Sequence, residues 1–377
     1  MKWLNCYRMK VVFVVFVAAI GICSGSAKAD FTFGEPVNLG SPVNTSYNEI
    51  VGCFSADGLT MYLSSANRPG TIRNWDIWVS TRDTIDDEWA TPVNLGATFN
   101  AYSMEMIGSI SADGLQLYFH AWEDRPGGYG ERDIWVASRA TTDDSWGEPV
   151  NLGPTINSAF RDTNPSISTD GLELYFASDR PGGYGDWDIW VSTRATANDP
   201  WTDPTNLGPE VNSSASEKLS YLSDDGRLLL INEDKAHPKR PGGYGGSDIW
   251  MTRRASVSDP WAAPINLGPI VNSSSNDGQA VLSHDGSTLY FSSARPGGLG
   301  GTIGDIYQAP IIPIVDLNGD GSIDTDDLLI MIENWKTDNS TCDIGPMPWG
   351  DGIVDFEDLK VFIKYWEQEN MPEEPEE

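Results

Sequence analysis

One pattern recurs five times along this chain of 377 residues. Each copy has the order Ser-x-Asp-Gly, an apolar run resembling Leu-Tyr-Phe, Arg-Pro-Gly, Asp-Ile-Trp (Asp-Ile-Tyr in the last copy), and most copies continue with a further Trp and Pro-x-Asn-Leu-Gly. The Asn-Leu-Gly segments begin at Asn38, Asn94, Asn151, Asn206 and Asn266, which lie 56, 57, 55 and 60 residues apart. Self-similarity at such a period predicts an array of equivalent supersecondary units that bury their cores against one another.

The repeat starts and ends out of phase. A first Pro-Val-Asn-Leu-Gly segment, residues 36–40, precedes any complete copy, and the last copy ends at residues 305–307 without one. If the array closes into a ring, the N-terminal segment supplies the missing outer strand of the last unit and hides sheet edges that favour aggregation. A linear solenoid has no use for this stagger. We therefore predict a mainly β chain whose residues 30–310 form a closed five-bladed β-propeller.

Each copy also predicts four strands. In the third, residues 164–168 alternate toward the turn Asp170-Gly171, and residues 172–177 form the return strand of a hairpin. Arg180-Pro181-Gly182-Gly183 must be a loop, because strands do not tolerate this density of Gly and Pro. Residues 188–194 and 204–207 then provide the third strand and the outermost strand.

The N-terminus has the features of a cleaved export signal. Lys2, Arg8 and Lys10 precede an apolar run over residues 11–22, and Ala27-Lys28-Ala29 offers a cleavage site. The run is too short to span a bilayer, and no other segment is apolar enough. Cys23 suggests lipid attachment as an alternative, which Ile22 disfavours. We predict residues 1–29 to be a signal peptide, and the mature chain to be secreted or at the cell surface, or periplasmic.

The net charge limits the partners. It is −31 for the full chain and becomes −35 when the four signal-peptide cations are removed. Nucleic acids and anionic lipids are therefore unsuitable partners, whereas Ca²⁺ or a neutral glycan suits an acidic surface. Acidity that serves only solubility is the alternative. We expect a monomer. Cys53 and Cys342 remain after signal removal, without metal-ligand spacing, and a disulfide between them is possible but unneeded. The three His residues do not repeat by position.

Two repeated residue types favour a structural role. We interpret the tryptophans of Asp-Ile-Trp as packing between neighbouring sheets, with a sugar-stacking stripe as the alternative. The arginines of Arg-Pro-Gly are expected to anchor loops through Asp or carbonyl groups. These residues are Trp78, Trp135, Trp190, Trp250 and Tyr307, and Arg68, Arg125, Arg180, Arg240 and Arg295.

A carboxylate lies eight residues before the turn Asp of every copy, just ahead of the predicted innermost strand. Five acids at this register would surround one mouth of the axial channel, where like charges raise pKa values or recruit a cation. The alternative, which we favour, is that each acid pairs with an Arg of its own or the next blade. These candidate catalytic or ligand residues are Glu49, Glu105, Asp162, Glu217 and Asp277.

Differences between the copies are weaker candidates for ligand contacts, since a symmetric scaffold carries function on its variable positions. The fourth copy inserts residues 233–239 before Arg240, and the first reads Arg68-Pro69-Gly70-Thr71. Met104, Phe160, Arg161 and Lys218 vary close to the acid register.

The repeat resembles the WD40-like propeller repeats of TolB-type periplasmic proteins, over about residues 31–310. The resemblance carries Ser-x-Asp-Gly, Leu-Tyr-Phe, Arg-Pro-Gly-Gly-x-Gly and Asp-Ile-Trp. It implies a scaffold that binds a protein or other ligand, usually without catalysis, and an acidic register of structural purpose.

After a linker at residues 311–315, a twelve-residue calcium-loop pattern begins. Oxygen-bearing side chains stand at positions 1, 3, 5, 9 and 12, Gly321 makes the turn at position 6, and Ser322 offers its carbonyl at position 7. The predicted ligands are Asp316, Asn318, Asp320, Ser322, Asp324 and Asp327. A helix-like segment follows to Trp335.

A second loop and helix recur 31 residues later. Positions 1 and 3 would be Met347 and Trp349, which cannot bind calcium by their side chains, but Asp343 can serve if the loop bulges around Pro346 and Pro348. The predicted ligands of this second site are Asp343, Asp351, Asp355 and Asp358.

The two loop–helix halves, residues 316–366, resemble a type I dockerin. The resemblance implies a small all-α, EF-hand-like domain, Asp at position 12, and recognition of a cohesin-like partner through Thr325 and Asp326 or Phe356 and Glu357. The two pairs differ, which argues against symmetric dual docking. Residues 367–377 are acidic and predicted to be disordered.

Two functions follow from these features. The first is an exported, calcium-binding scaffold that holds a glycan or protein ligand and is docked by its dockerin-like module. The sequence has no recognisable nucleophile–base pattern and no metal triad, which supports this non-catalytic function. The alternative is a glycoside hydrolase that uses two of the register acids, since dockerins accompany such enzymes and a carboxyl pair suffices for that chemistry. Equivalent acids in equivalent surroundings argue against it.

Overall fold

The computed structural model describes residues 31–122, 125–233, 239–300, 304–339, 341–345, 347, 350 and 353–370, the side chains of 367–370 excepted. The predicted signal peptide, most of the fourth-copy insertion and residues 371–377 lie outside these ranges. The chain divides into two compact units, one of residues 33–312 and one that contains residues 313–377. No helix among the described residues combines the length and apolar character needed to cross a bilayer.

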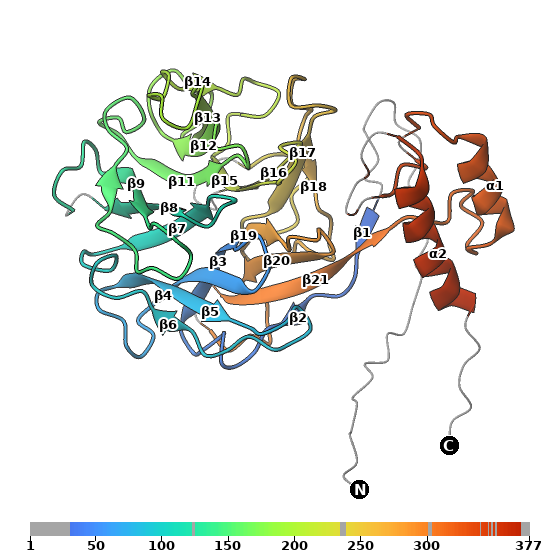
Figure 1. Cartoon of the computed structure of the whole chain (residues 1–377), viewed down its shortest axis with the longest axis horizontal. Helices are drawn as coiled ribbons and strands as arrows, with labels where there is room; N and C mark the ends of the chain where they lie inside the picture. Colours follow the sequence, from blue (N-terminus) through green and yellow to red (C-terminus); the bar gives the residue numbers. More distant parts are fainter. Residues whose placement is uncertain are drawn as a thin grey trace, which may run out of the picture. The chain divides into compact units, whose positions relative to one another are not determined.

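The first unit is a five-bladed β-propeller, as predicted. Five antiparallel sheets surround a common axis (Figure 1), and each innermost strand contacts the innermost strands of both neighbouring blades. Blade 1 consists of β3 (Asn48–Phe54), β4 (Thr60–Ala66), β5 (Trp75–Thr81) and β6 (Val93–Asn94), and blade 2 of β7 (Glu105–Ile110), β8 (Gln116–Trp122), β9 (Arg132–Ser138) and β10 (Val150–Asn151). Blade 3 consists of β11 (Asp162–Ile167), β12 (Glu173–Ser178), β13 (Asp188–Thr193) and β14 (Thr205–Asn206). Blade 4 consists of β15 (Glu217–Leu222), β16 (Leu228–Glu233), β17 (Ile249–Arg253) and β18 (Ile265–Asn266).

Blade 5 combines both ends of the propeller sequence. It contains β19 (Asp277–Leu282), β20 (Thr288–Ser293) and β21 (Asp305–Pro313), joined by β1 (Phe31–Phe33) and β2 (Val37–Asn38). Asn38 pairs with Tyr307 in β21, as Asn94 pairs with Trp78 in blade 1. The N-terminal segment therefore completes the last blade, which confirms the predicted closure. β21 runs to Pro313, beyond the predicted boundary at residue 310, because β1 also pairs with it.

The apolar cores lie between adjacent blades. Tyr62 and Ile77 of blade 1 pack with Phe119 and Trp135 of blade 2, for example. Near the axis, the backbone of β3 approaches the inner strand of the next blade closely, since a Cβ on Gly52 would lie 2.0 Å from the Ile107 side chain. Glycine at this position therefore lets neighbouring inner strands pack together.

Hydrogen bonds also cross the blade seams. Ser64 accepts the N–H of Ile107 at 3.0 Å, and Ser292 of blade 5 accepts the N–H of Val51 in blade 1 at 3.3 Å. The seam between the last and first blades therefore has the same kind of contact as a seam inside the chain.

The second unit carries the two predicted helices, α1 (Thr325–Glu333) and α2 (Phe356–Asn370). α1 begins with a capping box, in which Asp324 accepts the N–H of Asp326 and Asp327 accepts that of Asp324. Met331, Cys342, Ile344, Val354 and Phe362 form its buried core. α2 continues four residues past the predicted end of the module at residue 366.

Candidate functional site

The five register acids begin, or nearly begin, the innermost strands, and all five are fully buried. Each exposes 0% of its surface: Glu49, Glu105, Asp162, Glu217 and Asp277. Asp162 shows the arrangement that the blades share. Its carboxylate accepts the N–H of Ser158 at 2.6 Å and lies 2.6 Å from Nη2 of Arg180 in the same blade. The carboxylates therefore point into their own blades.

The same partner, the Arg of Arg-Pro-Gly, recurs in blades 2, 4 and 5. The N–O distances are 3.4 Å for Arg125 with Glu105, 2.9 Å for Arg240 with Glu217 and 3.0 Å for Arg295 with Asp277. In blade 1, Arg68 donates instead to the carbonyl of Val43; burial raises the pKa of Glu49, and hydrogen bonds from Thr45 and the charge of Arg68 oppose that rise. The predicted pairing of acids with arginines of their own blade is thus present in blades 2 to 5.

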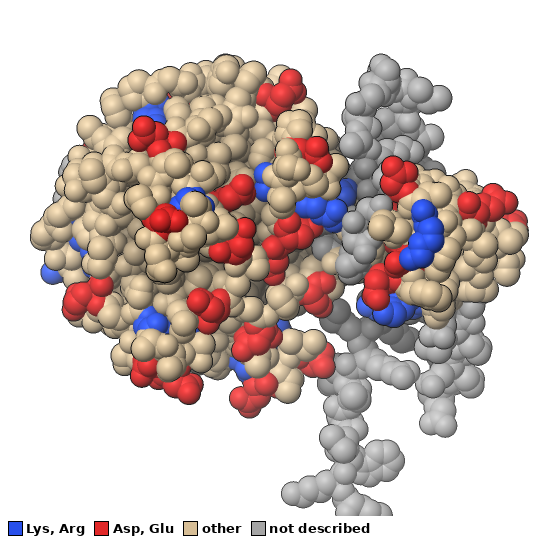
Figure 2. Space-filling view, turned by 45° about the horizontal axis from the view of Figure 1, so that its top comes forward, with Lys and Arg blue, Asp and Glu red and all other residues tan. Residues whose placement is uncertain are grey.

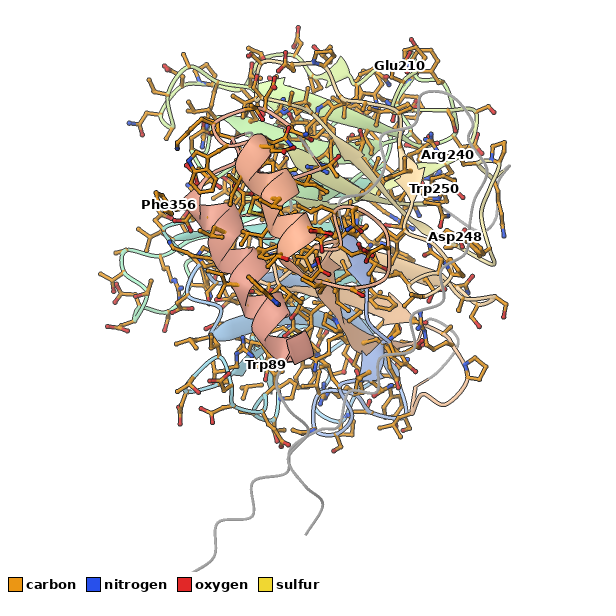
Figure 3. All side chains as sticks on the ribbon, turned by 90° about the vertical axis from the view of Figure 1, so that its right-hand side faces the viewer. Trp89, Glu210, Arg240, Asp248, Trp250 and Phe356 are labelled. Atoms are coloured by element: carbon orange, nitrogen blue, oxygen red, sulfur yellow. The ribbon has the colours of Figure 1, made fainter. Side chains whose placement is uncertain are left out.

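In blades 2 to 5 the arginine also connects the register acid to the repeated aromatic residue. In blade 4 the Arg240 guanidinium lies 5.5 Å from the centre of the Trp250 ring and donates to the carbonyl of Val211 at 2.6 Å. Figure 3 shows Arg240, Trp250 and Asp248 close together on this blade. The repeated aromatic residues are 4% to 7% exposed, which supports their interpretation as packing residues.

Blade 4 departs from this pattern by carrying a second acid. Glu233 pairs across the strands with Glu217, at the position held by Ser65, Ala121, Ser178 and Ser293 in the other blades. Its carboxylate accepts the backbone N–H of Arg240 at 3.0 Å, and burial raises its pKa to about 7. In the sequence, Glu233 was counted only with the fourth-copy insertion, although an acid among four small residues at one register was visible in the aligned copies.

A cavity of about 170 Å³ occupies the axis at the end where the inner strands reach their Asp-Gly turns. The variable residue of Ser-x-Asp-Gly from every blade lines it: Ala56, Ala112, Thr169, Asp224 and His284. The three polar residues form a chain, in which Thr169 Oγ1 donates to the Asp224 carbonyl at 2.6 Å and His284 Nδ1 lies 3.0 Å from Asp224 Oδ2. His284 was discounted in the sequence because the three His residues do not repeat by position. The variation of the second residue of Ser-x-Asp-Gly between copies was the signal that pointed to this group.

The disulfide between Cys53 and Cys342, which the sequence left possible but unneeded, is not formed. Cys53, which lines the same cavity, and Cys342 are both free and buried. Burial raises the pKa of the Cys53 thiol far above its ordinary value. The Cys53 thiol is therefore protonated at neutral pH and a poor nucleophile.

The first calcium-type loop is organised around Asp316. Its carboxylate accepts the N–H groups of Gly319 at 2.8 Å and Gly321 at 2.9 Å, and Asp320 accepts from Asn318 Nδ2 at 3.0 Å. Buried Asp327 accepts the N–H groups of Leu317 and Asn318 at 2.7 and 3.0 Å. Within the described ranges no three acidic, His or Cys side chains converge as metal ligands, but the oxygen-only donor set is the kind that Ca²⁺ prefers.

The second loop repeats this geometry with Asp343 at its start. Asp358 accepts the N–H of Gly345 at 2.8 Å, as Asp327 accepts that of Asn318. A Cβ on Gly350 would lie 2.0 Å from Asp343 Oδ1, so this glycine and the Asp343 carboxylate are in close contact. Gly350 has a φ of 71°, close to the 76° of Gly319 in the first loop. Asp343 thus corresponds to Asp316, with residues 346–349 as an insertion, whereas Asp351 lies outside the described residues.

The predicted partner-binding residues stand at equivalent places. Thr325 and Asp326 open α1, Phe356 and Glu357 open α2, and all four are exposed. Phe356 is 66% exposed and contacts Trp335 edge-on, with ring centroids 5.2 Å apart.

No family model matches this chain, and no curated protein matches it. Solved structures similar to it include TolB from Acinetobacter baumannii (13% identity, 74% of this chain and 63% of that chain, TM-score 0.42) and the GH43 endo-arabinanase from Bacillus licheniformis (13%, 71% and 96%, TM-score 0.44). A further structure is described as a glycoside hydrolase (11%, 75% and 92%, TM-score 0.49). At these identities and scores the matches bear on neither activity nor ligand.

Proposed function

We propose that this chain is an exported binding scaffold. Its propeller holds a glycan or protein ligand, and its C-terminal unit is a calcium-binding, dockerin-like module that docks onto a cohesin-type partner. The export signal, the WD40-like resemblance and the dockerin resemblance support the respective parts of this proposal.

The burial of the register acids carries the choice of binding over catalysis. A glycosidase needs one carboxyl group at the leaving-group oxygen and a second at the anomeric carbon or its attacking water. Asp162 and its four equivalents are 0% exposed, and the hydrogen bonds that Asp162 accepts from Ser158 and Arg180 come from its own blade. They hold loops in place and do not face a substrate.

The experiment is reducing-end release by the mature protein, from Asp30, in calcium, across neutral and acidic plant and algal polysaccharides. The proposal expects no release, together with retention of a polysaccharide or capture of a protein ligand by the propeller. Release that is lost in the Glu105→Gln or Asp162→Asn variant, with folding preserved, would overturn it.

One observation favours the glycoside hydrolase alternative. Glu217 and Glu233 are neighbouring carboxyl groups in unlike surroundings, and the raised pKa of Glu233 suits a general acid. The two side chains are only 0% and 2% exposed, so this alternative also requires the site to open. If release is observed, loss of activity in Glu233→Gln would locate it here.

A further inference from the structure

Blade 3 differs from the other blades at positions that meet in one surface hollow. The residue before the register acid is Arg161, where the other blades carry Asn48, Met104, Ser216 and Asn276. Phe160 precedes it, at a position that is aromatic elsewhere only in Tyr47. Both residues line a hollow of about 440 Å³ with Asp179, Arg180, Asp186 and the glycines of the Arg-Pro-Gly-Gly loop. Because the scaffold repeats, features confined to one blade are its best candidates for specificity.

The polar side of this hollow is rigid. Arg161 donates through Nε to Asp179 Oδ2 at 2.6 Å, and its backbone N–H donates to Asp179 Oδ1 at 2.7 Å. The guanidinium lies 4.7 Å from the centre of the Trp187 ring, and Lys218 Nζ lies 4.9 Å from the same ring centre. Arg161 remains 35% exposed. A planar donor fork and a carboxylate acceptor are therefore held side by side at the surface.

The apolar side of the hollow is aromatic. Phe160 lines the hollow and is 43% exposed. An exposed ring beside hydrogen-bond donors and acceptors presents both an apolar face and hydrogen-bonding groups. The volume is within the range usual for small-ligand sites.

We infer that this hollow on blade 3 binds a neutral saccharide. The inference rests on the proposed function and assigns its ligand class and place. The Phe160 ring suits the C–H face of a pyranose or furanose, and Arg161 with Asp179 suits neighbouring hydroxyl groups, which donate and accept. The two arginines of the lining, Arg161 and Arg180, are each paired with a carboxylate, and Asp186 and Glu131 add further negative charge that disfavours a uronate. Figure 2 shows further acidic side chains scattered over the propeller face in view.

Affinity electrophoresis of the full mature chain in gels containing xylan, arabinan, galactan or mixed-linkage β-glucan, with polygalacturonate as the acidic arm, tests this inference. The strongest neutral binder is then titrated calorimetrically, as its oligosaccharide, against Phe160→Ala and Arg161→Ala. The matched control is Tyr47→Ala, which removes an exposed ring at the same register of blade 1. Thermal melting verifies that each variant is folded, and Arg161→Lys, which keeps the charge without the fork, is the milder second variant.

The expected result is at least tenfold weaker binding for Phe160→Ala and Arg161→Ala, with Tyr47→Ala within twofold of the parent. If both blade 3 variants bind with the affinity of the parent, the inference is overturned and the scaffold proposal is left standing. Retention of polygalacturonate alone, or of no polysaccharide, would also overturn it. Hydrolysis of the polysaccharide would instead overturn the proposed function, because release of reducing ends is read separately from retention.

Discussion

At the residue scale, one buried assembly recurs in blades 2 to 5. The Arg of Arg-Pro-Gly joins the register acid, a backbone carbonyl and the repeated aromatic ring, as Arg180 does for Asp162, Ile156 and Trp190. Burying both charges is costly, and their pairing offsets that cost only while both partners are present. Substitution of these acids is therefore expected to lower the free energy of unfolding more than it affects ligand binding.

Asp162→Ala tests this role. The substitution leaves Arg180, which is only 12% exposed, without its carboxylate, and we expect the free energy of unfolding to fall by about 3 to 5 kcal/mol. Denaturant unfolding measures the loss. The control Asp86→Ala, at an exposed loop position, is expected to change it by less than about 0.5 kcal/mol. A similar small effect for both variants would contradict the structural role.

Glu233 is expected to make stability depend on pH. Its folded pKa of about 7 lies above the ordinary 4.5, so the folded chain binds this proton more tightly than the unfolded chain. Its contribution is fully present below about pH 4.5 and is lost as the pH rises to about 7, by about 3 kcal/mol. Glu233→Ser, which installs the residue of blades 1, 3 and 5, should flatten this part of the profile. Unfolding at pH 4.5, 5.5, 7 and 8 measures the difference from the parent, and parallel profiles would contradict the assignment.

At the element scale, the short strand β2 closes the ring. Asn38 Nδ2 donates to Asp305 at 2.7 Å, and Asn38 Oδ1 accepts from Asn44 at 2.8 Å, as Asn94 does with Asp76 and Asn100 inside the chain. A two-residue strand thus joins blade 5 with the same side-chain bonds that outer strands use elsewhere.

Removal of residues 30–40 is expected to weaken the propeller more than its length suggests. It leaves the edge of β21 exposed and removes several hydrogen bonds, at a cost of about 3 kcal/mol. Thermal unfolding and light scattering should show a lower melting temperature and aggregation. The single change Asn38→Ala should lie between the truncated chain and the parent, and an unaltered melting temperature after truncation would contradict closure by β2.

At the scale of the whole molecule, the chain divides into two compact units, and calcium is proposed to act on one. Ions that bind only the folded C-terminal unit stabilise it by about 2.7 kcal/mol at 100 times their dissociation constant. Calorimetry of the full chain should show one transition that rises with Ca²⁺ and a propeller transition that does not. Asp316→Ala should remove most of the shift, whereas Asp326→Ala, which changes an exposed helix residue, should keep it. A shift equal in both variants would contradict the assigned loop.

The propeller was predictable because the sequence signals that specify its strands and turns are local and recur in every copy. Asp-Gly turns and Arg-Pro-Gly loops act within a few residues, and the displaced Asn-Leu-Gly segment is recognisable because the other copies repeat it. The group of Thr169, Asp224 and His284 was not predictable in this way, because its members come from three blades and meet only when the ring closes. The burial of Asp162 and its equivalents also depends on tertiary packing, so sequence alone left open whether they face the channel or their arginines.

The closing of blade 5 also has a consequence for how the chain reaches its fold. The bond between Asn38 and Asp305 joins groups 267 residues apart, and contacts of such long range form slowly because a large loop must be ordered first. Synthesis delivers β2 before any blade and its partner β21 after all the others. We expect ring closure to be the last and slowest folding step, during which an open ring can recruit the strand of a second chain in place of its own.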